Sequence, residues 1–282
     1  MSSIPPELAQ KRDQLLARLR DFGPVAVAFS GGVDSSVVAK AAQIACGNDA
    51  IALTAVSPSL AAGELDLASN VANKIGIHHE LVRTEEFQNP DYVKNEPNRC
   101  FYCKDELYTR LEQLRHRFGF CVILNGANLD DRGDHRPGMQ AAREHQVDSP
   151  LLVCEFTKQD VRELAQFWDL PVWDKPASPC LSSRIAYGLE VTPERVRRVD
   201  TAEHYLKERL GLSELRVRYL EEDAASIEVP SPALPMLSDQ ELSAEVTAHL
   251  KTLGFLSVSI DPEGFRSGRL NDVIPLEQLQ KL

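Results

Sequence analysis

The chain has 282 residues, of which 43% are hydrophobic and 26% are charged. This composition is typical of a globular protein, and the length allows two domains of ordinary size or one large one. The formal net charge of −11 argues against a large surface that tracks nucleic-acid phosphates, because such surfaces are usually basic. It leaves room for a local basic pocket that binds a small anion.

The sequence shows no targeting or membrane segment. Its first residues, MSSIPPELAQKRDQLL, contain no long apolar stretch, and no apolar run approaches the ~20 residues that cross a membrane. We therefore expect a soluble cytoplasmic protein. In a reducing cytosol, the six cysteines are expected to be core residues, metal ligands or reactive thiols rather than disulfides.

Strand-like and helix-like stretches alternate through the first two thirds of the chain. The expected elements are an amphipathic helix at 6–21, a strand at 25–29, a helix at 34–46, a strand at 50–56, a helix at 63–75, a strand at 78–84, a helix at 102–117 and a strand at 121–128. Strands that alternate with helices of this length indicate βαβ units. They predict an α/β fold with a doubly wound parallel sheet.

A change of pattern near residue 190 predicts a second domain. Before it, Thr157 and Asp160 resemble a capping box for a helix at 158–168, and three prolines then end that helix. After it, the expected elements are a helix at 192–211, strands at 215–220 and 225–230, a proline-rich loop at 230–236, a helix at 238–255 and a strand at 256–261. We predict a first domain at 1–188 and a smaller α+β domain at 189–282.

The stretch SGGVDSS follows the first expected strand and precedes a helix. Its residues are Ser30, Gly31, Gly32, Val33, Asp34, Ser35 and Ser36. A glycine-rich turn here lets phosphate approach the backbone, and the helix offers unpaired N–H groups and the positive end of its dipole. The stretch lacks the lysine of a P-loop. We expect neutral serine donors and a Mg²⁺ ion that bridges Asp34 and the phosphates.

The stretch resembles the PP-loop of ATP pyrophosphatases; a ligand-free turn with a helix cap is the alternative interpretation. The resemblance implies that ATP is cleaved between the α and β phosphates and that an oxygen of the substrate is adenylylated. In that family the adenine lies against the end of the second strand. The resemblance therefore implies contacts from backbone groups around Thr54 to Val56.

Three cysteines carry the second chemical signal. Cys100 and Cys103 form a Cys-x-x-Cys pair at a helix start, where backbone N–H groups favour thiolates. Cys180 lies in a proline-bounded loop close to Arg184. The pair alone is compatible with zinc, with redox chemistry or with the core, but no second pair completes a zinc site, and redox chemistry leaves Cys180 unexplained. The remaining three cysteines lie in apolar stretches and are expected in the core. They are Cys46, Cys121 and Cys154.

Basic and acidic side chains mark two further candidate sites. Alternation within LRVRYL puts Arg216 and Arg218 on one face of a strand, where two guanidiniums can bind a phosphate, although ordinary surface arginines are the alternative. Arg184 and Glu228 are weaker candidates. The loop NLDDRGDHRPG follows the fourth strand and should rim a ligand site. Its candidates for binding metal or capping a helix are Asp130, Asp131 and Asp134, with Asp131 preferred for the ATP site.

Taken together, SGGVDSS, NGANLDDRGDHRPGMQAA, KPASPCLSSRIAYG and LRVRYLEEDAASIEV resemble the LarE family over essentially the whole chain. The resemblance implies an ATP-dependent sulfur transferase of nickel-pincer nucleotide cofactor biosynthesis, which serves lactate racemase. Its substrate would be pyridinium-3,5-biscarboxylate mononucleotide, adenylylated on a carboxylate and converted to a thiocarboxylate. The resemblance also implies that Arg216 and Arg218 hold the substrate phosphate. It implies a homo-oligomer, with a hexamer as the candidate assembly.

The family has two sulfur chemistries. One form spends its own cysteine, at the position matching Cys180; the other holds a [4Fe–4S] cluster on three thiolates. Because Cys100 and Cys103 are present, this sequence resembles the cluster form, in which three ligands leave one iron open for hydrosulfide. Sacrifice of Cys180 and a zinc ion on the thiolates stay open. So do a cluster-dependent tRNA thiolase, which the acidic charge disfavours, an amide-forming synthetase and a non-catalytic nucleotide sensor.

Overall fold

The computed structural model describes residues 4–132 and 137–265. By their contacts they divide into two units, each described here by itself. The first unit holds the described residues of 1–57, 63–85 and 100–178, and the second holds those of 58–62, 86–99 and 179–282. These units differ from the predicted division at residue 188 in three short segments, 58–62, 86–99 and 179–188, which belong to the second unit.

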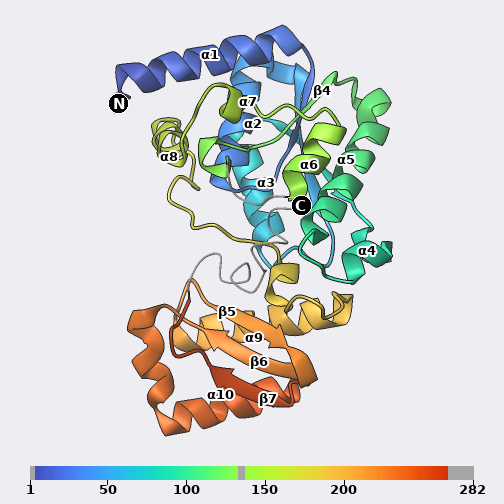
Figure 1. The fold of residues 1–282 in the computed structure, drawn as a ribbon. Helices are drawn as coiled ribbons and strands as arrows, with labels where there is room; N and C mark the ends of the chain where they lie inside the picture. The colour runs from blue at the N-terminus through green and yellow to red at the C-terminus, as the bar shows by residue number, and fades with distance from the viewer. Residues whose placement is uncertain (1–3, 133–136, 266–282) are drawn as a thin grey trace. The chain divides into compact units, whose positions relative to one another are not determined.

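A parallel sheet forms the centre of the first unit (Figure 1). It has four strands in the order β3-β2-β1-β4. The strands are β1 Val25–Ala28, β2 Ala50–Val56, β3 His78–Arg83 and β4 Val122–Leu124. Strand order reverses between β1 and β4, so a crevice is expected beyond their carboxyl ends. Strand β4 is shorter than predicted because the chain turns away after Leu124, and Asn125 N donates to the Asp148 carbonyl.

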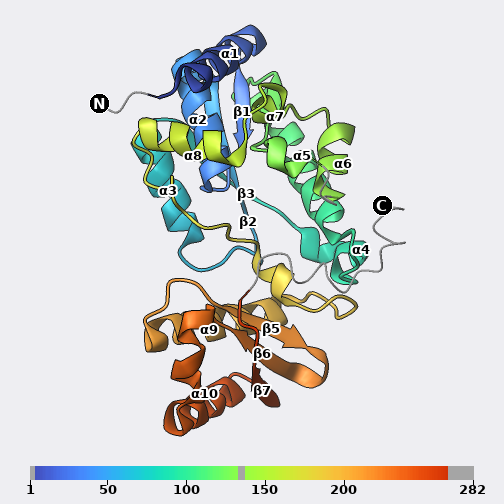
Figure 2. The same cartoon turned by 60° about the vertical axis from the view of Figure 1, so that its left-hand side comes forward.

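Helices cover both faces of this sheet (Figure 2). They are α1 Pro6–Phe22, α2 Val33–Cys46, α3 Glu64–Ile75, α5 Arg99–Phe118, α6 Pro137–Glu144, α7 Pro150–Val153 and α8 Lys158–Phe167. Alternate strand residues enter two separate cores: Val25 and Val27 pack with α2 on one face, and Ala26 packs with Leu111 of α5 on the other. The predicted α/β fold is confirmed, and α6 and α7 are additions.

The second unit has the predicted α+β order. It contains α4 Pro90–Val93, α9 Pro193–Leu210, α10 Gln240–Thr252 and the strands β5 Arg216–Leu220, β6 Ala224–Glu228 and β7 Ser257–Ile260. Strand β5 pairs antiparallel with β6, which pairs parallel with β7. The proline-rich loop predicted at 230–236 is wrong: Ser231–Ser238 form a 3₁₀-helix. Prolines preset φ near the helical value, and 3₁₀ turns are used in short pieces.

Short 3₁₀-helices complete both units. They are η1 Gly47–Asp49, η2 Glu86–Gln88, η3 Leu129–Asp131, η4 Leu181–Arg184, η5 Glu221–Asp223 and η6 Ser231–Ser238. Among the described residues, no helix is both long enough and apolar enough to cross a membrane.

Candidate functional site

The predicted phosphate loop lies between β1 and α2, and one of its serines holds it closed. Ser35 Oγ accepts a hydrogen bond from Ser30 N (3.2 Å) and donates one to the Gly32 carbonyl (3.1 Å). The side chain of Ser36 is fully buried, and its hydroxyl has no partner among the described residues. Ser35 therefore shapes the loop from within.

Backbone N–H groups are the loop's available anion donors. Gly32 is the N-cap of α2, and no side chain of the described residues caps that helix. Ser36 N donates to the Gly32 carbonyl at 3.0 Å, so the N–H groups of Val33, Asp34 and Ser35 precede the helical hydrogen-bond ladder. Together with the helix dipole they favour a bound anion.

Two glycines allow the loop to pack tightly. Gly31 has φ +71°, and a Cβ built there would lie 2.8 Å from Ala68 Cα in α3. A Cβ on Gly126, which follows β4, would lie 2.8 Å from Ser35 N. Both separations are shorter than real Cβ contacts. The loop is thus held between α3 and the segment after β4.

Asp34, the predicted magnesium ligand, is bonded to two residues far away in the sequence. Asn128 Nδ2 donates to Asp34 Oδ1 at 3.0 Å, and Lys158 Nζ lies 2.5 Å from Asp34 Oδ2. The Asp34 and Lys158 side chains are 26% and 36% exposed, so both can reach a ligand. The Lys158 ammonium therefore lies next to a residue in the first turn of α2.

Lys158 is a functional candidate that sequence reasoning missed. It is the first residue of α8, whose N-terminus is fixed by the predicted capping box: Thr157 N donates to Asp160 Oδ2 at 2.9 Å, and Asp160 N donates to Thr157 Oγ1 at 3.1 Å. The backbone N–H of Lys158 also donates to Asp130. The phosphate loop contains no lysine, but Lys158 of helix α8 lies beside it. In the sequence, only the capping box indicated where the backbone of Lys158 would be.

The acidic residues after β4 organise the backbone around this site. Asp131 Oδ2 accepts from Asn128 N at 2.9 Å, and Asn128 caps the short helix η3 in return. Asp130 accepts from the N-terminus of α8. Both aspartates act as caps, which is one of the two roles predicted for them, and Asp131 positions the residue that contacts Asp34. Asp134 lies outside the described residues.

Thr54, predicted near the adenine, has its side chain inside the sheet. It is 2% exposed, and its hydroxyl donates to the Phe29 carbonyl at 2.9 Å. Its oxygen therefore accepts from His79 Nε2, which lies 2.7 Å away. Burial lowers the pKa of His79, in keeping with a neutral donor. Val56 is half-buried at the end of β2, and adenine contacts from this strand stay a prediction that concerns its backbone.

In the second unit, the predicted arginines form a buried charged cluster. Arg184 binds Glu203 through two hydrogen bonds of 2.9 and 3.3 Å, and Arg218 binds Glu228 through two of 3.0 and 3.1 Å. All four side chains are no more than 7% exposed. The structure brings these candidate residues together with Arg216 of the same strand, as predicted from the alternation of β5.

Arg216 differs from its two neighbours. It is 6% exposed, and no acceptor among the described residues takes a hydrogen bond from it; its guanidinium lies 4.3 Å from the centroid of the Phe265 ring. Burial, followed by the charges of Arg184 and Arg218, lowers the pKa of Arg216 to about 10. Among the described residues, this cluster holds three guanidiniums and two carboxylates, and the excess of positive charge suits a bound anion.

The cysteines divide between the units. Cys100 and Cys103 lie in the first turns of α5 in the first unit, and Cys180 precedes η4 in the second. Cys100 and Cys180 are exposed and Cys103 is half-buried. No group of three or more histidine, cysteine or acidic side chains within the described ranges is arranged to hold a metal ion.

The core prediction for the other cysteines is correct only in part. Cys154 is buried, and Cys46 is half-buried with Sγ 3.4 Å from the Leu19 carbonyl. Burial raises the pKa of both thiols. Cys121 is exposed, so its predicted place in the core is wrong. Cys121 lies before the first residue of β4, and the side chain of the neighbouring Phe120 is buried in the core.

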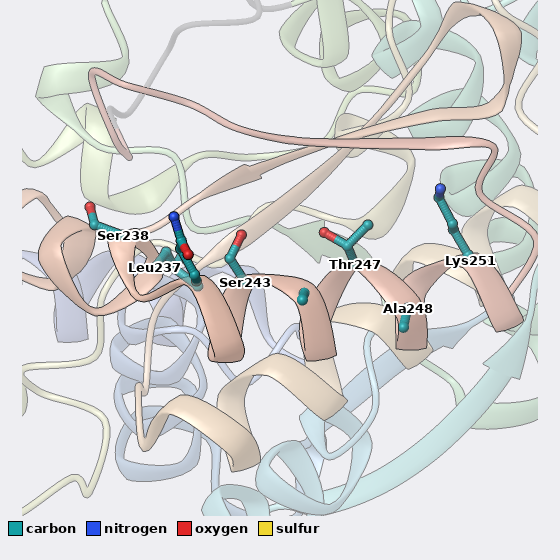
Figure 3. Close-up of a pocket in the computed structure, with 8 residues that line it drawn as sticks. Leu237, Ser238, Ser243, Thr247, Ala248 and Lys251 are labelled. Carbon is teal, nitrogen blue, oxygen red and sulfur yellow. The ribbon is translucent and has the colours of Figure 1, made fainter.

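A separate hollow lies on the second unit (Figure 3). It has a volume of 520 Å³ and is lined by η6 and α10, with Ser243, Thr247 and Lys251 on one side of the helix. None of the residues predicted for the site lines it.

Comparison with known proteins places the chain in a family. Residues 12–102, which include the phosphate loop, match the family model described as asparagine synthase. An uncharacterized protein of Synechocystis is 44% identical over 267 residues, 95% of this chain and 99% of that protein. An uncharacterized protein of Methanocaldococcus jannaschii is 25% identical, over 86% of this chain and 91% of that protein.

A third relative has a named activity. The pyridinium-3,5-bisthiocarboxylic acid mononucleotide synthase of Lactiplantibacillus plantarum is 37% identical over 277 residues, 96% of this chain and 98% of that protein. The chain belongs to the LarE family. This similarity covers both units, and the resemblance inferred from the sequence motifs is confirmed. The parallel sheet and its phosphate loop form the PP-loop domain of this LarE-family protein.

Proposed function

We propose that this LarE-family protein is an ATP-dependent sulfur transferase. It adenylylates a carboxylate of pyridinium-3,5-biscarboxylate mononucleotide, with release of pyrophosphate, and converts the acyl-adenylate to a thiocarboxylate, with release of AMP. The observation that carries the proposal is the phosphate loop with Asp34 held between Asn128 and Lys158. The name of the 37% identical synthase supports the choice of substrate.

The first unit supplies the groups that bind ATP. The N–H groups at the start of α2 and the Lys158 ammonium favour the polyphosphate. Asp34 Oδ2 already accepts one cationic group, and carboxylate oxygen suits Mg²⁺, so the residues fit a magnesium ion on Asp34. A bound magnesium ion would neutralise phosphate charge. The Lys158 ammonium would be available to the phosphates.

Adenylylation removes a chemical obstacle, because a free carboxylate has no good leaving group. Once AMP is attached, sulfur can attack the carboxyl carbon and AMP departs. Negative charge builds up on the phosphates as pyrophosphate leaves. The helix N-terminus and Lys158 are prearranged donors for that charge, which is the largest contribution such a site usually makes to catalysis.

The second unit supplies the site for the substrate phosphate. Arg216 is the principal ligand in this proposal because its guanidinium has no acceptor among the described residues. Arg218 and Arg184 are paired with Glu228 and Glu203, which fix the two guanidiniums in position and offset their charges. A phosphate bound there would offset the excess charge of the cluster.

Cys100, Cys103 and Cys180 are proposed to hold a [4Fe–4S] cluster. Three thiolates are a suitable donor set, and none of these side chains is fully buried. A cluster held in this way would supply an iron with an open position for sulfide. The alternative is that Cys180 itself gives up its sulfur, and the exposure of its side chain is compatible with that reaction.

Metal analysis separates the two sulfur chemistries. Iron and acid-labile sulfide are measured in anaerobically reconstituted protein and in the Cys100→Ala, Cys103→Ala and Cys180→Ala variants, with the exposed Cys121→Ala as the control. About four of each per chain, lost in the three variants and kept in the control, supports the cluster. Absence of iron, with loss of sulfur mass at Cys180 after turnover, supports the sacrificial reaction. Formation of ADP instead of AMP rejects adenylylation altogether.

Two further properties belong to this proposal. We expect no stable complex with tRNA, because the net charge is −11; a salt-dependent affinity would favour a tRNA thiolase instead. We also expect a homo-oligomer in the cytoplasm. Light scattering on the eluting protein would give the number of chains, and a monomer would contradict that part.

A further inference from the structure

Arg99 connects the two chain segments that carry the proposed sulfur ligands. It is the residue before Cys100, and it is 3% exposed. Its Nη1 donates to the Ser182 carbonyl at 2.8 Å and also to the Asn95 side chain. Ser182 is fully buried and lies two residues after Cys180. One guanidinium thus links the segment leading into Cys-x-x-Cys with the loop that follows Cys180.

Neighbouring side chains strengthen this link. We call residues 86–99 the lead segment and residues 179–188 the Cys180 loop; Arg99 and both of these stretches belong to the second unit. Tyr92 Oη lies 2.7 Å from Ser182 Oγ, and both side chains are buried. Asn95 Nδ2 donates to the carbonyls of Ile185 (3.2 Å) and Ala186 (2.8 Å).

The backbone of the lead segment is shaped for these contacts. Asn95 has φ +57°, in the left-handed region that most non-glycine residues avoid. Its carbonyl accepts from Gly188 N at 3.2 Å, and the Val93 carbonyl accepts from Val191 N at 2.9 Å. Asparagine tolerates this region better than most other residues, and contacts from both backbone and side chain hold Asn95 in it.

Burying the charged Arg99 side chain costs more free energy than burying an apolar side chain of similar size. A buried guanidinium loses its hydration, and an apolar side chain would occupy the same space at a lower free-energy cost. What the guanidinium provides is a rigid set of donors that can bind two chain segments in a defined direction. This points to a role in holding those segments in register.

We propose that Arg99 is a positioning residue for the sulfur site. By binding the Ser182 carbonyl, it fixes the end of the lead segment, whose next residue is Cys100, against the Cys180 loop. The inference rests on the proposed function, because it requires the three thiols to work together. It does not depend on whether the centre is an iron–sulfur cluster, zinc or a cysteine that gives up its sulfur.

Thiol cross-linking of the metal-free full-length chain tests the positioning directly. Dibromobimane bridges two thiols only when they can approach closely, and mass spectrometry reports bridges between Cys180 and Cys100 or Cys103. We expect bridges in the parent protein and a roughly tenfold lower yield in Arg99→Ala, with an intermediate yield in Arg99→Lys. The control is Arg195→Ala, because Arg195 also donates to a backbone carbonyl of this unit, that of Glu190 at 2.7 Å, but on the surface.

A second variant keeps the test decisive if Arg99→Ala destabilises the folded protein. If Arg99→Ala lowers the melting temperature of the whole chain, Tyr92→Phe removes only the hydroxyl that contacts Ser182. A reduced bridge yield in this variant, at an unchanged melting temperature, still supports the positioning of the Cys180 loop. An unchanged yield in the folded variants overturns it, as does the absence of bridges in the parent protein.

Iron content and the electron paramagnetic resonance spectrum of the reduced, reconstituted protein separate this inference from the proposed function. Loss of iron or an altered spectrum in Arg99→Ala, with pyrophosphate release retained, supports both. If the parent protein binds no iron but forms bridges that depend on Arg99, the cluster fails and the positioning role stands. A further outcome is that the parent protein binds iron while Arg99→Ala has the same iron content, the same spectrum and the same bridge yield. That result would support the cluster and would contradict the positioning role.

Discussion

Lys158 forms an ion pair with Asp34 across 124 residues of sequence, with Nζ 2.5 Å from Oδ2. This contact brings a lysine to a phosphate loop that contains none. It also gives Asp34 a cationic partner. ATP with magnesium would compete for both members of the pair, because its phosphates attract the ammonium and its metal ion attracts the carboxylate.

Replacement of Lys158 should impair chemistry more than folding. In Lys158→Met we expect the rate of substrate-dependent pyrophosphate release to fall by about 10²–10³, the usual effect of losing one transition-state donor. The melting temperature should change little, because the pair is partly exposed and such pairs contribute at most about 1 kcal/mol. Lys74→Met is the matched control, since Lys74 forms an exposed pair with Asp169 at 2.7 Å. Equal rates in the two variants would contradict the assignment.

Gly31 should be far less replaceable than Gly23, although both glycines have a positive φ. Their φ values are +71° and +74°, but a Cβ on Gly23 meets no atom within 4 Å, whereas one on Gly31 lies 2.8 Å from Ala68 Cα. Gly23→Ala should cost about 1–3 kcal/mol, because φ +74° with ψ −133° is a backbone conformation that alanine rarely adopts. Gly31→Ala should cost several times more, and it should abolish nucleotide binding. Urea unfolding and ATP titration measure the two effects, and similar costs would refute the packing argument.

Local signals in the sequence predicted most of the fold. Helix α2 ends at Cys46 before Gly47, and α3 ends at Ile75 before Gly76, with both glycines at positive φ. The capping box of Thr157 and Asp160 fixed the start of α8. These signals succeed because the free energy that decides each helix end comes from residues within one turn.

The site was only partly predictable because its partners are distant in the sequence. SGGVDSS predicted the loop, but nothing in it reveals that Asn128 and Lys158 approach Asp34. Alternation in β5 predicted that Arg216 and Arg218 share a face. It could not show that Arg218 is paired with Glu228 while Arg216 has no hydrogen-bond acceptor among the described residues. Pairings of this kind depend on which strands and helices become neighbours.

The two arginines of β5 should respond differently to substitution. Arg218→Met leaves Glu228 without its bidentate guanidinium partner in a buried site, and we expect a loss of about 3–5 kcal/mol in unfolding free energy. Arg216→Met removes a charge that has no ion pair in the described part of the chain, so stability should be kept or should rise.

Substrate kinetics distinguish the same two positions. Arg216→Met should raise the KM for the mononucleotide and should have little effect on a substrate analogue without the phosphate. Urea unfolding and the two KM values are the measurements, with Arg209→Met as a surface control because its pair with Glu245 is exposed. An unchanged KM for the mononucleotide would remove Arg216 from the phosphate site.

His145 should make the stability of the first unit depend on pH. Its imidazole joins Glu112 and Asp105 of α5, with Nδ1 and Nε2 at 3.0 and 2.9 Å from their carboxylates. Burial opposes the charged form, but the hydrogen bonds and charges of both carboxylates outweigh it and raise the pKa of His145 above its ordinary 6.5. The folded protein therefore binds this proton more tightly than the unfolded chain does.

The sign of the effect follows from that difference. The stabilisation is fully present below about pH 6.5 and is lost as the pH rises through the raised pKa of the folded state. We expect the difference in unfolding free energy between the parent and His145→Gln to be largest near pH 6 and to shrink toward pH 9. Taking this difference cancels the titration of groups that do not interact with His145. A difference that is constant with pH, or that grows as the pH rises, would show that the imidazole is neutral between its two carboxylates.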